Sequence, residues 1–171
     1  MRLARTSGFS LIELMISIAI LAILLALGWP SFQGSLRSNR IATASNEFLA
    51  ALSLARSEAI RNTRGSGICA STDGTSCDGT DWAAGWLVWG DTNGDGTFDA
   101  GEPVLRVKQD SAQVTVTGPA DPITFDSRGR RRGSTDVAVT MQPDECGGRQ
   151  LQRTLTVKAV GQVSMARGDC T

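Results

Sequence analysis

Five side chains with oxygen ligands are concentrated in residues 91–102, which read DTNGDGTFDAGE. They are Asp91, Asn93, Asp95, Asp99 and Glu102. Their spacing matches that of an EF-hand loop, in which carboxylate and amide oxygens bind Ca²⁺. An EF-hand loop joins two helices, whereas residues 85–90 and 104–109 on either side of this loop have the composition of strands. The loop is therefore interpreted as a hairpin turn rich in Asn, Asp and Gly, with a Ca²⁺ site as the alternative.

A basic segment suggests a different chemistry, contact with phosphate groups. Residues 127–133 read SRGRRRG, and their arginines are Arg128, Arg130, Arg131 and Arg132. Lys+Arg and Asp+Glu both number 17, so the chain as a whole is neutral. Any nucleic acid must therefore be bound by a local patch such as this one. The alternative is a solvated turn, or a turn that forms ion pairs with acids of a neighbouring subunit.

Four cysteines, Cys69, Cys77, Cys146 and Cys170, allow three disulfide pairings. An even number of cysteines in an exported domain favours structural disulfides, and the absence of paired C-x-x-C units disfavours a zinc site. We predict Cys69–Cys77, which closes a short loop, and Cys146–Cys170, which ties the C-terminal tail to the domain. Closing a loop of about 25 residues contributes roughly 3–4 kcal/mol through chain entropy.

One carboxylate, Glu13, interrupts an otherwise apolar run from Phe9 to Trp29. As a helix this run is about 31 Å long, enough to cross the hydrocarbon core of a bilayer. A charged side chain in that core costs about 2.5–3.5 kcal/mol. An ordinary secretory signal would be shorter and would end in a small-residue cleavage site, and a plain membrane anchor leaves Glu13 unexplained. A third interpretation is cleavage after Gly8, which frees the amine of Phe9 and retains the apolar helix.

The chain contains no histidine. This excludes Ser–His and Cys–His nucleophile pairs and every histidine-based metal site. Because the cysteines are assigned to disulfides and the acids lie mostly in turns, we find no catalytic constellation and predict that the chain is not an enzyme. No cofactor is predicted apart from the alternative of Ca²⁺ in the 91–102 loop.

A long helix and a set of short strands must position these groups. Beyond Pro30 an amphipathic pattern replaces the apolar run, and its apolar face carries Phe32, Leu36, Ile41, Ala44, Phe48, Leu52, Ala55 and Ala59. The helix is predicted to end near Asn62, where NTRGSG is a stop signal. Eight segments rich in β-branched or aromatic residues follow, separated by Gly, Asp, Pro and Ser. They are residues 67–71, 85–90, 104–109, 113–118, 122–126, 136–143, 153–159 and 161–166.

The sequence GFSLIELM, the apolar run after it and WPSF resemble the class III leader of type IV pilins and type II secretion pseudopilins. LARSEAIRNTRGSGICAS, GWLVWGDTNGDGTFDAGEPVLR and ITFDSRG extend this to a resemblance, over essentially the whole chain, with the FimT/FimU/GspH family of minor pilins and pseudopilins. The resemblance implies an α+β type IV pilin fold. A long N-terminal helix, apolar in its first half and amphipathic in its second, would pack on an antiparallel β-rich head. The implied parts are a cleaved leader (1–8), a transmembrane and filament-core segment (9–30), an amphipathic helix (31–62) and the head (63–171).

The resemblance also implies functions for individual residues. A prepilin peptidase would cut between Gly8 and Phe9 and methylate the new amine, and Glu13 would pair with the Phe9 amine of a neighbouring subunit. The implied function is a minor pilin that helps initiate or cap a type IV pilus, with other major and minor pilins as partners. It would be a single-pass protein of the inner membrane with a periplasmic head, later assembled into an extracellular or periplasmic filament. A minor pseudopilin of a type II secretion system is an alternative.

DNA capture for natural transformation is the other alternative that the resemblance implies. Some FimT-type minor pilins bind DNA through a G-R-x-R motif near the C-terminal end. Here the corresponding late turn begins at Gly161 and reads GQVS, whereas residues 129–132 read GRRR and fit the motif in an earlier loop. The family's DNA-binding motif therefore cannot be assigned to this sequence by position. The predicted DNA site rests only on the positive charge of Arg128, Arg130, Arg131 and Arg132.

Cleavage is the first prediction. N-terminal sequencing of the protein extracted from membranes should begin at Phe9, because the basic, polar leader ends at Gly8 and the apolar helix that follows is retained. A start near Trp29 would contradict this and would indicate an ordinary secretory signal.

Overall fold

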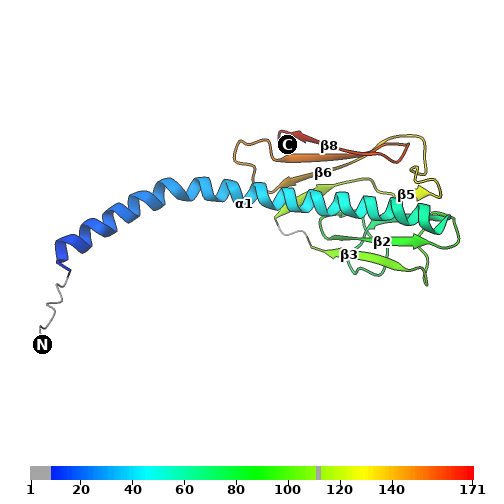
Figure 1. The fold of residues 1–171 in the computed structure, drawn as a ribbon, viewed down its shortest axis with the longest axis horizontal. Helices are drawn as coiled ribbons and strands as arrows, with labels where there is room; N and C mark the ends of the chain where they lie inside the picture. The colour runs from blue at the N-terminus through cyan, green and yellow to red at the C-terminus, as the bar shows by residue number, and fades with distance from the viewer. Residues whose placement is uncertain (1–8, 111–112) are drawn as a thin grey trace, which may run out of the picture. The chain divides into compact units, whose positions relative to one another are not determined.

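The structure, a computed structural model, describes residues 9–110 and 113–171. Gly8 and the rest of the predicted leader lie outside the described residues, so the cleavage stays a prediction. The chain separates into two compact units, the first ending at Leu36 and the second spanning Arg37–Thr171. The second unit, called the head below, contains all the strands and the C-terminal part of helix α1 (Leu11–Asn62) (Figure 1).

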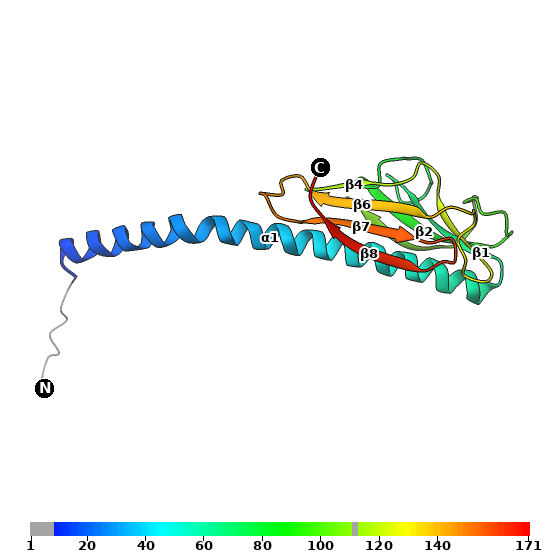
Figure 2. The same ribbon diagram turned by 90° about the horizontal axis from the view of Figure 1, so that it is seen from above.

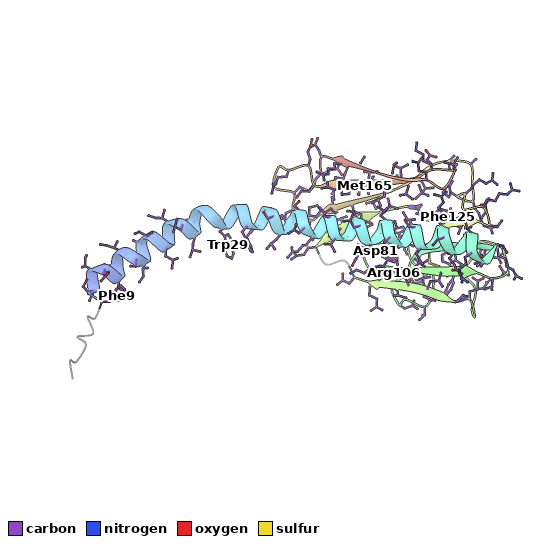
Figure 3. All side chains as sticks on the ribbon, viewed as in Figure 1. Phe9, Trp29, Asp81, Arg106, Phe125 and Met165 are labelled. Carbon is purple, nitrogen blue, oxygen red and sulfur yellow. A yellow bond between two sulfur atoms is a disulfide. The ribbon has the colours of Figure 1, made fainter. Side chains whose placement is uncertain are left out.

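The first unit contributes the N-terminal part of α1, and its large apolar side chains are exposed in the part of the chain that the structure describes. Phe9 is 79% exposed, Ile18 58% and Trp29 62% (Figure 3). Over residues 9–110 and 113–171, no helix combines the length and the apolar character that a membrane crossing requires. The predicted transmembrane segment therefore stays a prediction.

The part of α1 inside the head carries a buried apolar face at helical spacing. Its completely buried residues are Ile41, Phe48, Ala51, Leu52, Ala55 and Ala59. The predicted face is thus confirmed from residue 41 onward. The sequence also predicts Phe32 and Leu36 on this face, which is wrong: they are 60% and 40% exposed. Both residues lie in the first unit, outside the head. The apolar periodicity of the sequence therefore extends beyond the residues that are buried.

Helix α1 ends at Asn62, as predicted, because that side chain holds the next residues in a turn. Its Oδ1 accepts hydrogen bonds from the amides of Arg64 (2.9 Å) and Gly65 (3.0 Å), and its Nδ2 donates to the Gly65 carbonyl (2.6 Å). Thr63 has φ 61°, in the left-handed region that commonly terminates a helix. The chain therefore enters the first strand directly after α1.

Eight strands follow, one for each predicted segment. They are β1 (Gly65–Ala70), β2 (Gly85–Asp91), β3 (Val104–Gln109), β4 (Val114–Thr117), β5 (Ile123–Asp126), β6 (Val137–Pro143), β7 (Gln152–Val157) and β8 (Val163–Gly168). They form two four-stranded sheets with the orders β3-β2-β1-β5 and β4-β6-β7-β8, and every neighbouring pair is antiparallel. Both sheets lie along α1 in the head (Figures 1 and 2). The predicted α+β architecture, a long N-terminal helix with an antiparallel β-rich head, is confirmed.

One apolar core lies between α1 and the inner faces of both sheets. The Phe48 ring meets Trp82 and Trp86 edge-on, with ring centroids 5.6 and 5.9 Å apart. In β7 burial alternates with every residue, so that Leu155 and Val157 face this core. The two sheets are separate hydrogen-bonded units, and this shared core joins them.

A second, smaller apolar cluster lies on the opposite face of β1 and β2. Cys69, Leu87 and Trp89 are buried there, with Cys77 and Phe98 packed against them. The centroids of the Trp89 and Phe98 rings are 5.7 Å apart, so the 91–102 loop covers this face. Both predicted disulfides are present: Cys69–Cys77 closes the loop after β1, and Cys146–Cys170 ties the segment after β6 to the end of β8.

Gly67 is required by this cluster, because the Trp89 ring lies where a Cβ at position 67 would be. We expect Gly67→Ala to lower the free energy of unfolding by about 1–3 kcal/mol, the usual cost of overpacking a buried site. Urea denaturation of the detergent-solubilised protein with both disulfides intact measures it. Gly79→Ala is the matched control, since the nearest atom to its Cβ is 3.7 Å away. Equal stability of the two variants would contradict the packing argument.

Candidate functional site

Glu13 lies near the start of α1, and its carboxylate forms no hydrogen bond or ion pair with any residue that the structure describes. Its backbone is fully engaged: the amide donates to Ser10 Oγ (3.3 Å) and the carbonyl accepts from Ser17 Oγ (2.8 Å). Phe9, four residues earlier in the sequence, is exposed. The predicted assembly residues are thus present on an open helix with no partner for the acid among residues 9–110 and 113–171. Their predicted processing and assembly functions stay predictions.

Asp91 begins the acidic loop and is 1% exposed. Its Oδ1 accepts a hydrogen bond from the Gly94 amide (2.5 Å), and its Oδ2 accepts one from the Gly96 amide (2.9 Å). Both glycines have φ 86°, which a residue with a side chain rarely adopts. The Arg132 guanidinium, 3.3 Å from Asp91 Oδ2, supplies the compensating charge. The carboxylate therefore holds the loop on amide groups and an arginine.

The other acids of the loop have the same function toward the backbone. Glu102 accepts hydrogen bonds from the amides of Thr92 (2.6 Å) and Asp99 (3.2 Å). Asp95 accepts from the amide and the hydroxyl of Thr97, both at 2.7 Å, and these bonds lower the pKa of the Asp95 carboxyl. Asn93 donates from its Nδ2 to both Asp95 and Asp99.

The alternative of a Ca²⁺ site in this loop finds no support in the geometry. In the described part of the chain, no group of three or more His, Cys, Asp or Glu side chains is arranged to hold a metal ion. The carboxylates of Asp91 and Glu102 are directed at amides of their own loop, and Asn93 presents its donor nitrogen to the acids. The EF-hand spacing recurs here because Asn, Asp and Gly form tight turns in either setting. The loop joins the antiparallel strands β2 and β3, so the predicted hairpin is confirmed, and the Ca²⁺ site stays an untested alternative.

The arginine turn, residues 127–132, is organised by Asp126 at the end of β5. The Asp126 Oδ1 accepts hydrogen bonds from the amides of Arg128 and Arg130, both at 2.9 Å, and its Oδ2 pairs with the Arg130 guanidinium (3.1 Å). Burial raises the pKa of the Asp126 carboxyl, but the Arg130 and Arg128 amides and the Arg130 guanidinium outweigh it, so the pKa is lowered overall. Arg131 donates to the Thr135 carbonyl, and Arg132 to the Arg64 carbonyl as well as to Asp91.

The four predicted phosphate-contact residues are therefore not equivalent. Arg130, Arg131 and Arg132 make contacts inside the head, and of the four only Arg128 is exposed with no side-chain partner among the described residues. Nearby carboxylates and carbonyls engage three of the four guanidinium groups, and the predicted contact of these arginines with phosphate stays a prediction. The structure does not otherwise test DNA binding.

The structure places the late turn at residues 158–162, between β7 and β8, rather than at residues 161–164, and it lies against the arginine turn. The Arg131 amide donates to the Ala159 carbonyl (3.1 Å), and Gly161, with φ 81°, contacts the backbone of Gly129 so closely that a Cβ would overlap it. Lys158, at the start of the late turn, is exposed. Sequence reasoning missed Lys158 as part of this basic end of the head. No local signal could have found it, because the contact joins segments about 30 residues apart.

Comparison with known proteins agrees with this architecture. The family model described as "Type II transport protein GspH" matches residues 44–161, and the model described as "Prokaryotic N-terminal methylation motif" matches residues 3–29. No curated protein matches the chain.

Two crystal structures of the type IV minor pilin FimU from Pseudomonas aeruginosa strain PAO1 are similar in fold. One covers 75% of this chain and 89% of the FimU chain with a TM-score of 0.56, and the other covers 73% and 91% with a TM-score of 0.54. Both are 21% identical to this chain, so they show the fold alone. The GspH model, by contrast, covers most of the chain, from the head part of α1 to the turn after β7. The chain therefore belongs to the GspH family of type IV minor pilins and type II secretion pseudopilins.

Proposed function

We propose that this chain is a minor pilin that helps initiate or cap a type IV pilus. The observation that carries the proposal is the exposed apolar part of α1, inside a segment that matches the N-terminal methylation motif. Its one carboxylate, Glu13, has no partner among the described residues. Exposed apolar side chains in such number need cover from other molecules. The head already has a buried core of its own, so the function of the first unit is to assemble.

Processing by a prepilin peptidase prepares the chain for assembly. Cleavage between Gly8 and Phe9 creates a free α-amine, which the enzyme methylates, at the start of the apolar segment. Until assembly that segment anchors the chain in the inner membrane as a single pass, with the head in the periplasm. The two disulfides of the head support this compartment, because disulfides persist in the periplasm and are rare in the cytosol.

Glu13 sets the register between neighbouring subunits. Apolar side chains alone let packed helices slide, since one contact is replaced by another of similar energy. A carboxylate in an apolar environment is tolerated when it has a positive partner, and the methylated amine of Phe9 in a neighbouring subunit is such a partner. Any shift along the helix axis separates the pair, so one pair is sufficient to penalise slippage. The partners are the other major and minor pilins of the filament.

A minor pseudopilin of a type II secretion system is the second candidate. It is favoured by the description of the matching family model as a type II transport protein. The same processing, anchoring and register arguments apply, and the filament would then stay in the periplasm. Isolation of the chain with other minor pilins or with secretion pseudopilins distinguishes the two systems.

Glu13→Ala tests the assembly function. We expect cleavage to proceed normally while recovery of the chain in sheared filaments falls by more than tenfold, because an amine left unpaired in the filament core costs about 3–5 kcal/mol. Immunoblots of sheared filaments and of membranes measure both quantities. Glu145→Ala is the control, since it removes a 76% exposed acid of the head. Normal recovery of the Glu13→Ala chain would refute the register argument.

DNA capture is the third candidate, favoured by the contact between the arginine turn and the late turn. This contact brings the GRRR sequence, residues 129–132, beside the turn where the family's DNA-binding motif would lie. Arg128 and Lys158 are exposed there and have no carboxylate partner among the described residues. The chain without residues 1–8 loses Arg2 and Arg5, leaving 17 − 2 = 15 basic against 17 acidic residues, so only a local patch can attract DNA.

We expect weak, sequence-independent binding of duplex DNA that decreases with salt. Arg128→Gln with Lys158→Gln should flatten the salt slope by about 2, near one unit for each lost phosphate contact. The control, Arg106→Gln with Lys108→Gln on β3, removes the same two charges elsewhere and should leave the slope unchanged. Titrations of the full chain in detergent at several salt concentrations measure it. No binding at low salt would eliminate this candidate.

A further inference from the structure

Three segments of the head meet near the end of α1. Gly129 of the arginine turn lies against this helix, because a Cβ at position 129 would be 2.7 Å from Ile60 Cδ1 and 3.1 Å from Arg56 Nε. Gly161 of the late turn lies in turn on the backbone of Gly129. Figures 1 and 2 both show β5 and the turn between β7 and β8 near the last residues of α1. Side chains carried by these segments define the junction patch: Arg56, Ile60, Arg128, Lys158 and Val160.

Two side chains of the junction patch are aliphatic and exposed to water. Ile60 is 48% exposed and Val160 is 63% exposed. Val160 lies inside the late turn, which is closed by a hydrogen bond from the Gly161 amide to the Lys158 carbonyl (2.7 Å). Aliphatic side chains grouped with charged ones are typical of a surface that contacts another protein.

The other three side chains of the patch are cations without an acid to pair with. Arg128 and Lys158 are exposed. None of the ion pairs formed within residues 9–110 and 113–171 includes Arg56, Arg128 or Lys158. The Nε of Arg56 is buried and has no hydrogen-bond partner in the described part of the chain. The patch therefore carries positive charge that the chain itself does not compensate.

The acids bonded to the two turns do not neutralise this charge. Asp126 accepts two amide hydrogen bonds of the arginine turn and pairs with the Arg130 guanidinium, which lies outside the patch set. Asp136 is exposed and accepts a hydrogen bond from the Ala159 amide (3.0 Å). Three cations thus face one acid that has no cation of its own.

This combination favours a protein segment over a nucleic acid. Contacts with phosphate groups are made by cations, hydroxyls and amides, so they give aliphatic side chains no cover. An acidic segment that also carries an apolar side chain pairs with the cations and covers Ile60 and Val160 at the same time. Charge complementarity of this kind also excludes partners with the wrong charge.

We propose that the junction patch binds an acidic segment, with an apolar side chain, on the head of a different minor pilin. The inference deepens the proposed function and rests on it. Because the partner is a different protein, the contact is made once and does not continue from copy to copy. A single contact of this kind suits a subunit that initiates or caps a filament.

The test places a photoreactive benzophenone amino acid at position 127 of the full chain, in cells that assemble the filament. Ser127 is exposed and precedes Arg128. We expect a light-dependent adduct with another pilin, mapped to a peptide that contains aspartate or glutamate. Arg128→Gln with Lys158→Gln should lower the adduct yield about tenfold, because two cations are lost from the contact. Val160→Ser should lower it about fivefold, because an apolar contact is lost.

The controls make the same chemical changes on β3, which is the edge of its sheet opposite β5. They are Val104→Ser, at an exposed valine, and Arg106→Gln with Lys108→Gln, and they should leave the yield unchanged. Charge exchange tests the contact directly: Lys158→Glu should abolish the adduct, and a lysine in place of the mapped acid of the partner should restore it. Non-reducing peptide mapping of both disulfides verifies that each variant is folded.

The apolar variant distinguishes a protein from DNA. Duplex DNA at the patch would depend on Arg128 and Lys158 but not on Val160, so a yield that is insensitive to Val160→Ser overturns the inference. No adduct, or an adduct with nucleic acid, with a second copy of this chain or with a protein that is not a pilin, overturns it as well. Filament recovery separates the two proposals: a chain that enters filaments without forming the adduct refutes only this contact, whereas absence of the unaltered chain from filaments refutes the proposed function.

Discussion

The buried face of α1 between Ile41 and Ala59 is the contact on which the head depends. The two sheets do not share a hydrogen-bonded strand pair, so packing beneath this helix face is the main contact between their inner faces, supplemented by the contact of the arginine turn with the late turn. Complete burial of Ile41, Phe48 and Leu52 contributes about 1.5–3 kcal/mol for each side chain. That sum is comparable to the whole stability of an ordinary domain, about 5–15 kcal/mol. Ala55 and Ala59 add little area, but their small size lets the strands approach the helix.

A buried charge and hydrogen-bonded turns stabilise the head near the end of α1. Asp91 is buried in the last position of β2, and its cost is offset by two amides and by Arg132, which is 41 residues away in sequence. The acidic loop that follows covers the outer face of β1 and β2 through Phe98 on Trp89. The loop with EF-hand spacing thus covers a small apolar cluster, and the Arg132 guanidinium pairs with its first carboxylate. The same arginine is thereby removed from the set available to nucleic acid.

The two units of the chain differ in whether their large apolar side chains are buried within the chain. The head buries its own core and closes it with two disulfides. The first unit leaves large apolar side chains and one carboxylate without partners among the described residues. The first unit therefore needs cover from other molecules, whereas the head does not. This division is consistent with membership of a family of filament proteins.

The sequence by itself determined the features that depend on local pattern. Period-3.6 burial from Ile41 to Ala59, the stop at Asn62, the eight strand segments and the turn character of residues 91–102 all follow from neighbouring residues. The disulfide pairing could also be predicted, because each bridge joins cysteines that are close along the chain. Only the tertiary structure decided the strand orders, the engagement of Arg132 by Asp91, the contact of the late turn with Gly129, and the exposure of Phe32 and Leu36. The physical reason is that hydrophobic periodicity specifies which face of an element is buried, whereas its partner is selected by packing and charge compensation between segments distant in sequence.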